Sequence, residues 1–258
     1  MNFLDRPVAV AKSLLRKLRG QRPATSSNYR FLTSEQEAFG SARGWHEADV
    51  AKRQDKAYRD LLKQMYAGQP RLDLQVAVEA IRRTGLVAPT ILEVGCGSGY
   101  YSEVLTHLLD PPPHYSGLDY SWAMVELARQ HYPARKWING DGTRLPFPDN
   151  AYDIIFNGVS LMHIRDYPAA IAESWRVARR WSIFHTVPVL QQRATTTLYK
   201  QAYQGETVEI VFNENSLLML LAQVGLEPRA VIESIPYDLH AVLGESTMSR
   251  TYICEVLS

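Results

Sequence analysis

Cysteine is scarce in this sequence, and long apolar runs are absent from it. The two cysteines, Cys96 and Cys254, lie far apart in the chain, and such a pair builds neither a zinc cluster nor a disulfide framework. No apolar run approaches the roughly 20 residues that a membrane-spanning helix needs. The first residues also lack the apolar segment and small-residue cleavage site of a secretory signal. We therefore expect a soluble, cytoplasmic protein without a bound metal.

A strong overall charge is also missing, since the net charge is only +1. Nothing global therefore indicates a nucleic-acid partner. The first 30 residues are locally basic, with seven Lys or Arg residues against the single acid Asp5. Apolar residues recur at helical spacing between Leu4 and Leu18, which predicts a basic amphipathic helix. Such a helix packs on the domain or makes a weak peripheral membrane contact through residues 1–22. The oligomeric state stays open.

The pattern of the chain changes near residue 86. Residues 1–85 contain a linker at 21–28 and helical patterns from about residue 34, over 47–66 and over 73–84, with no convincing strand. We expect this part to form an N-terminal helical extension and cap. Residues 86–258 should form the core, with a substrate-side insert at 188–212.

The core alternates strand and helix patterns, which is typical of an α/β fold with a largely parallel sheet. Only about 13 residues join the last two strands, too few for a parallel crossover, so the final strand should be antiparallel. We predict a Rossmann-like, seven-stranded mixed sheet. Its strands are expected at 90–94, 115–119, 136–139, 153–157, 182–187, 230–235 and 249–256.

A glycine-rich loop follows the first of these strands, in the stretch ILEVGCGSGYYS. Gly95, Gly97 and Gly99 let the backbone approach a ligand closely, and the helix that follows offers free N–H groups. Three interpretations compete: a tight turn without ligand, a dinucleotide site, and an S-adenosylmethionine site. Tyr100 stands where the dinucleotide pattern G-x-G-x-x-G requires its third glycine, which favours the last interpretation.

At this point the sequence resembles the class I S-adenosylmethionine-dependent methyltransferases, in particular the type 11 or ubiquinone/menaquinone-methyltransferase-like group. Residues 93–99 match their E/D-x-G-x-G-x-G signature, and residues 117–129, 139–156 and 160–177 resemble their later motifs in order. One departure is RVARRWSIFHTV, which lacks the glycines that usually precede the fifth strand. The turn there should differ from the family pattern.

The resemblance implies S-adenosyl-L-methionine as cofactor and S-adenosyl-L-homocysteine as product. Asp119 would accept hydrogen bonds from the ribose hydroxyls, and Asp141 from the adenine amino group. Tyr120, Trp122 and Met124 would touch the adenine. The implied cofactor-binding set is Glu93, Gly95, Cys96, Gly97, Gly99, Asp119, Tyr120, Met124, Asp141, Gly142, Asn157 and Gly158, with the last two near the methionine end.

Methyl transfer needs alignment above all, and a general base only if the acceptor keeps its proton until attack. His163, after the fourth strand, is the candidate base, with a structural role as the alternative, whereas His185 is expected to be a buried, hydrogen-bonded strand residue. The aromatic residues of the cap suit closure over a ligand, although core packing explains them equally well; they are Tyr29, Trp45, His46, Tyr58 and Tyr66.

We expect methyl transfer to a small molecule, such as a sugar, a quinone or a secondary metabolite. Two alternatives stay open: a cyclase or decarboxylase on the same fold, and a catalytically silent binding partner.

Overall fold

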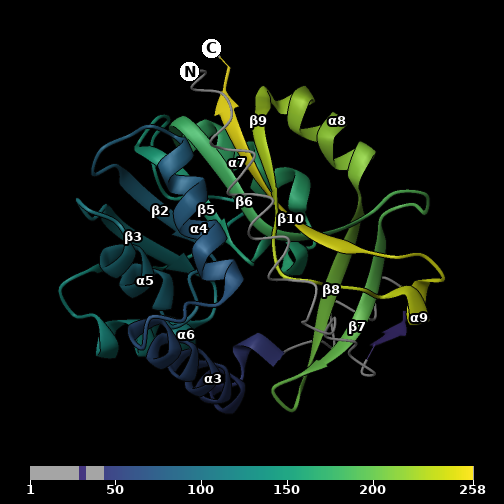
Figure 1. Cartoon of the computed structure of the whole chain (residues 1–258), viewed down its shortest axis with the longest axis horizontal. Coiled ribbons are helices and arrows are strands. Elements are labelled where there is room, and N and C mark those ends of the chain that lie inside the picture. Colours follow the sequence, from purple (N-terminus) through teal and green to yellow (C-terminus); the bar gives the residue numbers. More distant parts are fainter. Residues whose placement is uncertain (1–28, 33–43, 258) are drawn as a thin grey trace.

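A computed structural model describes residues 29–32 and 44–257, and Figure 1 shows a mixed sheet with helices on both sides. Seven strands run in the order β4-β3-β2-β5-β6-β10-β9. The first five are parallel, and β10 is antiparallel to both of its neighbours. Their bounds are β2 Thr90–Val94, β3 His114–Asp119, β4 Lys136–Asn139, β5 Tyr152–Gly158, β6 Ala178–Leu190, β9 Leu226–Glu233 and β10 Met248–Val256. The predicted fold class and the antiparallel last strand are confirmed.

Three further strands, β1 Tyr29–Phe31, β7 Thr196–Ala202 and β8 Gly205–Asn213, extend this sheet to ten. The last two residues of β6, Val189 and Leu190, pair in parallel with the end of β8, and β7 and β8 form an antiparallel hairpin. The predicted count of seven strands is therefore corrected. The Thr-, Gln- and Tyr-rich insert forms strands, because alternation along β8 places apolar side chains in the core.

Helices cover the two faces of the sheet. The buried alternating side chains of β2 and β5 point to opposite faces, so that Ile154 and Phe156 join one core cluster and Ile155 another. One face carries α3 Ala48–Tyr66, α4 Leu72–Arg83, α5 Tyr100–Leu108 and α6 Trp122–His131. The other carries α7 Tyr167–Val177 and α8 Glu214–Val224, and α9 His240–Leu243 lies beside the hairpin. The two short 3-10 turns are η1 Gly44–His46 and η2 Leu161–His163.

The N-terminal region agrees only in part with its prediction. Helices α3 and α4 lie where their patterns placed them, and Gly85 follows α4 with a left-handed φ of 69°. The expectation of no strand before residue 85 is wrong, because β1 pairs with β7. The amphipathic helix and contact surface of residues 1–22, the linker and the helix start near residue 34 lie outside the described residues. Among the described helices, none is long and apolar enough to cross a membrane.

Candidate cofactor and acceptor site

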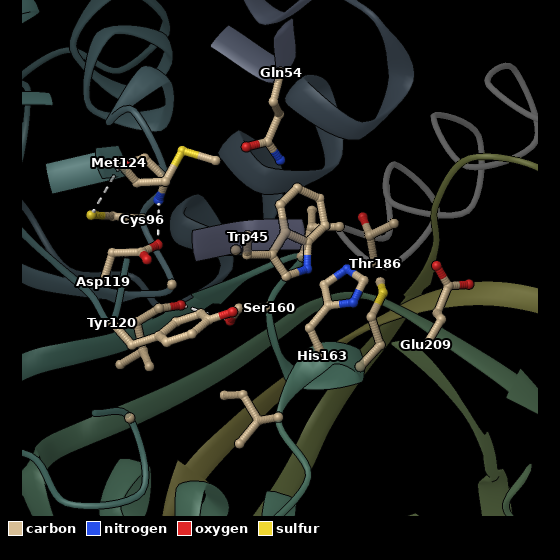
Figure 2. A pocket seen from close by; sticks show the side chains of 18 of the residues that line it. Trp45, Gln54, Cys96, Asp119, Tyr120, Met124, Ser160, His163, Thr186 and Glu209 are labelled. Atoms are coloured by element: carbon tan, nitrogen blue, oxygen red, sulfur yellow. Dashed lines mark hydrogen bonds between the residues drawn. The ribbon is translucent and has the colours of Figure 1, made fainter. Parts of the chain in front are cut away.

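One cavity of about 720 Å³ lies at the carboxyl edge of the parallel strands, where ligands bind in open α/β sheets. In Figure 2, Asp119, Tyr120 and Met124 line one side, and Thr186 and Glu209 lie across from them. The rings of Trp45 and His163 stand between these two groups, with centroids 5.2 Å apart. The cavity therefore has a side lined by the predicted cofactor residues and a side lined by residues of the hairpin.

The glycine loop forms the floor of the first side. Gly95, Gly97 and Gly99 all have left-handed φ values, and α5 starts directly after Gly99. A Cβ on Gly97 would meet only the tip of Gln54, 3.9 Å away, so its missing side chain leaves room for a ligand. At Gly99 a Cβ would instead lie 2.5 Å from Trp137, so this glycine serves packing. Cys96, on the same loop, is buried and lines the cavity.

Asp119 ends β3 and holds the loop. Its carboxylate accepts hydrogen bonds from the backbone N–H of Gly97 and of Ser121, both at 2.8 Å. Burial raises the pKa of Asp119 to about 6, and the two backbone N–H bonds oppose that shift. A carboxylate has about four acceptor positions, so two remain for the hydroxyl groups of a ligand. The geometry therefore fits a ribose.

The adenine side shows one departure from prediction. Tyr120, Met124, Asp141 and Gly142 all line the cavity. Trp122 does not, because it lies at the first position of α6 and points outward, where the Arg129 guanidinium lies 5.0 Å from its ring. The carboxylate of Asp141 accepts from the backbone N–H and hydroxyl of its near neighbour Thr143.

One predicted residue of β5, Asn157, and one of β2, Glu93, are placed differently from expectation. Gly158 lines the cavity as predicted, and a Cβ there would overlap with Oε1 of Glu93. Glu93 itself lies beneath the loop, buried and accepting from the hydroxyl of Tyr115, and burial raises its pKa. Asn157 faces α7, where its Nδ2 donates to Ser174. The expected direct contacts of Glu93 and Asn157 with a cofactor are thus corrected, because strand alternation turns Asn157 away from Gly158.

His163 stands where the two sides of the cavity meet. A carbonyl only accepts, so its Nδ1–H must donate to the Val208 carbonyl at 2.6 Å. Burial lowers the pKa of His163, which keeps the ring neutral near pH 7. The neutral ring then carries a lone pair on Nε2, as a general base requires. His185, by contrast, is buried and bonded to Thr251 and Thr186, in agreement with its expected structural role.

The hairpin contributes residues that the sequence did not single out. Lys200 and Glu209 line the second side of the cavity as an ion pair at 2.8 Å. Two β-branched residues that line the cavity, Val159 and Thr186, have left-handed φ values of 60° and 56°. Such backbone strain is concentrated at functional sites, and the residue types at these positions do not predict it.

The aromatic residues of the cap divide between the cavity and other surfaces. Trp45 and Tyr58 line it, and Tyr58 stacks on Tyr100 with centroids 3.9 Å apart. His46 packs edge-on against Tyr120. Tyr66 instead donates to Glu103 on the outside. Closure of the cap over a ligand is thus proposed for Trp45 and Tyr58 alone.

Comparison with known proteins gives this geometry a family. Residues 92–185 match the model of the methyltransferase domain family. The malonyl-[acyl-carrier protein] O-methyltransferase of Serratia marcescens is 36% identical over 89 residues, which are 34% of each chain. The demethylmenaquinone methyltransferase of Geobacillus stearothermophilus is 32% identical over 117 residues, 43% of this chain and 49% of that protein. The chain thus spans only a third to a half of the length of these curated relatives.

Solved structures share the fold at low sequence identity. Burkholderia thailandensis 1,6-didemethyltoxoflavin-N1-methyltransferase, solved with S-adenosylhomocysteine, has a TM-score of 0.54 at 13% identity and covers 92% of this chain and 94% of its own. Geranyl diphosphate C-methyltransferase of Streptomyces coelicolor has a TM-score of 0.55 at 12% identity, covering 71% and 76%.

Residues 92–185 therefore match a methyltransferase domain, and the described residues share their fold with solved S-adenosylmethionine-dependent methyltransferases. The predicted resemblance to this family is confirmed over residues 92–185, and the activity and cofactor of the whole chain are proposals.

Proposed function

We propose that the protein transfers a methyl group from S-adenosylmethionine to a small-molecule acceptor. The observation that carries this proposal is the continuity of one cavity from the glycine loop and Asp119 to His163 and the hairpin. Its volume of about 720 Å³ lies in the upper part of the roughly 300–1,000 Å³ range of ligand pockets. A cofactor on the first side leaves space for an acceptor on the second.

When bound, the cofactor supplies a methyl group activated by its sulfonium. The chain positions the reactants: the glycine loop and Asp119 hold one, and Trp45 and the hairpin shield the other from water. His163 Nε2 would take the acceptor's proton at the boundary of the two sides. Aromatic and apolar walls from Trp45, Met162, Tyr203, Ile235 and Tyr237 favour a ring-shaped metabolite, such as a quinol, over an extended polar chain.

Calorimetric titration of the protein with S-adenosylhomocysteine tests the proposal. We expect saturable binding, weakened about ten- to hundredfold by Asp119→Ala, because hydrogen bonds to a charged group contribute about 1.5–3 kcal/mol. Asp60→Ala is the matched control, since Asp60 is an exposed acid on α3 paired with Lys63. Absence of binding to the unaltered protein at millimolar concentration would overturn the proposal, and so would equal binding by the two variants.

A further inference from the structure

The second side of the cavity contains a polar group built from four separate segments. Lys200 of β7 and Glu209 of β8 form its ion pair. Tyr29 of β1 donates to Oε1 of Glu209 at 3.0 Å, and its hydroxyl also contacts that of Tyr237. The Nζ of Lys200 lies 5.3 Å and 5.8 Å from the centroids of these two tyrosine rings. The ammonium is thus fixed in place by one carboxylate and two aromatic faces.

The two charges of this pair differ in what a ligand can reach. The Glu209 side chain is only 2% exposed, and each of its oxygens already accepts a hydrogen bond, from Lys200 and from Tyr29. The Lys200 side chain is 27% exposed and has three N–H donors, of which Glu209 takes one. A molecule in this part of the cavity therefore meets hydrogen-bond donors and positive charge.

The groups around Lys200 narrow the chemistry further. His163 lines the same cavity and feels the charges of Lys200 and Glu209, and its Nε2 offers a lone pair. The Nδ1 of the same ring is fixed by the carbonyl of Val208, which adjoins Glu209. A hydroxyl group whose proton goes to His163 and whose oxygen accepts from Lys200 satisfies both. A cationic amine can donate to His163, but it offers Lys200 no acceptor and would bring a second positive charge to it.

We propose, on the basis of the methyltransferase function above, that Lys200 and Glu209 form an acceptor subsite for an acidic hydroxyl group, a phenol or an enol. The O–H bond breaks and its proton goes to His163 Nε2. The acceptor oxygen bonds to the methyl carbon while the carbon–sulfur bond breaks, with its electron pair left on sulfur. Lys200 stabilises the oxyanion during this displacement, and Glu209 holds Lys200 in position. The reaction is an O-methylation.

Binding of 4-nitrophenol to the protein saturated with S-adenosylhomocysteine tests this assignment without turnover. The phenolate absorbs visible light, so one titration reports both the affinity and the pKa of the bound probe. We expect the bound probe to have a lowered pKa. Lys200→Met should weaken binding about ten- to hundredfold, as for losing a hydrogen bond between charged groups, and should abolish the pKa shift.

Glu209→Gln should act in the opposite direction. Removing the compensating carboxylate leaves the charge of Lys200 unbalanced, so phenolate binding should become several-fold tighter. General damage to the hairpin would instead weaken binding in both variants. Glu206→Gln is the matched control, because Glu206 is a carboxylate on the same strand that pairs with Arg30 on the exposed side. This variant should bind the probe like the unaltered protein.

Failure of this inference is distinguishable from failure of the proposed function. Absence of S-adenosylhomocysteine binding overturns both. If that ligand binds but 4-nitrophenol does not, or if Lys200→Met binds it as tightly as the unaltered protein does, only the subsite assignment falls. Tighter binding of 4-nitrobenzylamine than of 4-nitrophenol also overturns it, and assigns the site to cationic amines.

Discussion

Replacement of Asp119 by asparagine should remove the contribution that this side chain makes to the pH dependence of stability. Burial raises the pKa of Asp119 from the ordinary 3.8 to about 6. Below 3.8 the carboxyl is neutral in both the folded and the unfolded chain. As pH rises towards about 6 the unfolded chain releases this proton while the folded chain retains it, so the free energy of unfolding falls. The total loss is about 3 kcal/mol, since each unit of pKa difference corresponds to about 1.4 kcal/mol.

The asparagine side chain in the Asp119→Asn variant would imitate the neutral carboxyl and would not titrate. Stability of Asp119→Asn relative to the unaltered protein should therefore rise by about 1.5 kcal/mol between about pH 5 and about pH 8. Urea unfolding followed by circular dichroism, at constant ionic strength, measures this difference directly. The charge of Asp119 also raises the pKa values of Glu93, Cys96 and Tyr120. The thiol and the phenol are raised from ordinary values of 9 and 10, above this pH range, so only Glu93 need be controlled. The same comparison in a Glu93→Gln background removes that coupling.

Ligand affinity should depend on pH in the opposite direction to stability. Ribose hydroxyls donate to the ionised carboxylate, so the affinity for S-adenosylhomocysteine should increase as pH rises through about 6. In Asp119→Asn the affinity should be weaker and should lack this increase. The raised pKa of Asp119 would be refuted if the difference in free energy of unfolding between the two proteins did not change across this pH range.

Three further predictions concern other parts of the site. His163→Gln should lower kcat and remove the acidic limb of the pH–rate profile. In the unaltered enzyme this limb should lie below the ordinary histidine pKa of 6.5, because burial lowers the pKa of His163. An unchanged profile would exclude His163 as the base. Gly99→Ala should lower the free energy of unfolding by about 2–4 kcal/mol, because left-handed strain adds to overlap with Trp137. Gly68→Ala should lower it by only about 1–2 kcal/mol, because Gly68 has a φ of 79° but open space around it. Equal losses in the two variants would contradict the steric argument. Gly158→Ala should destabilise the protein by about 1–3 kcal/mol, measured by thermal unfolding, because the new methyl group overlaps with Glu93. The same substitution in a Glu93→Ala background should cost less, which would confirm the contact.

The sheet core could be predicted because its signals are local. Alternation, the glycine loop and the short connection before the last strand all act within a few residues. Gly225, for example, follows α8 with a φ of 94°, a left-handed conformation that glycine adopts without strain. Helices α3 and α4 were likewise predicted from periodicity alone. These elements also place Asp119 and the loop at one sheet edge.

What could not be predicted depends on register and on distant pairing. Asn157 and Gly158 adjoin in sequence, yet strand alternation sends one side chain to α7 and leaves the other position at the cavity. The three residues of β1 are too short a segment to predict a strand from sequence, and they form one because β7 is available as a partner. Lys200 and Glu209 are ordinary charged residues in the sequence, and only the antiparallel register of the hairpin brings them together.

Strand β6 joins the parallel sheet to the β7–β8 hairpin. It pairs with β5 along its first part, yet its backbone ladder to the hairpin involves only Val189 and Leu190. The hairpin is therefore joined to the sheet that carries the glycine loop by a short backbone ladder, and its other contacts are made by side chains and by the bond from His163 to Val208. Exchange of residues 191–213 for the corresponding segment of another methyltransferase should change acceptor preference while leaving donor affinity intact. Recombination at this joint offers a simple route by which one cofactor scaffold acquires new substrates.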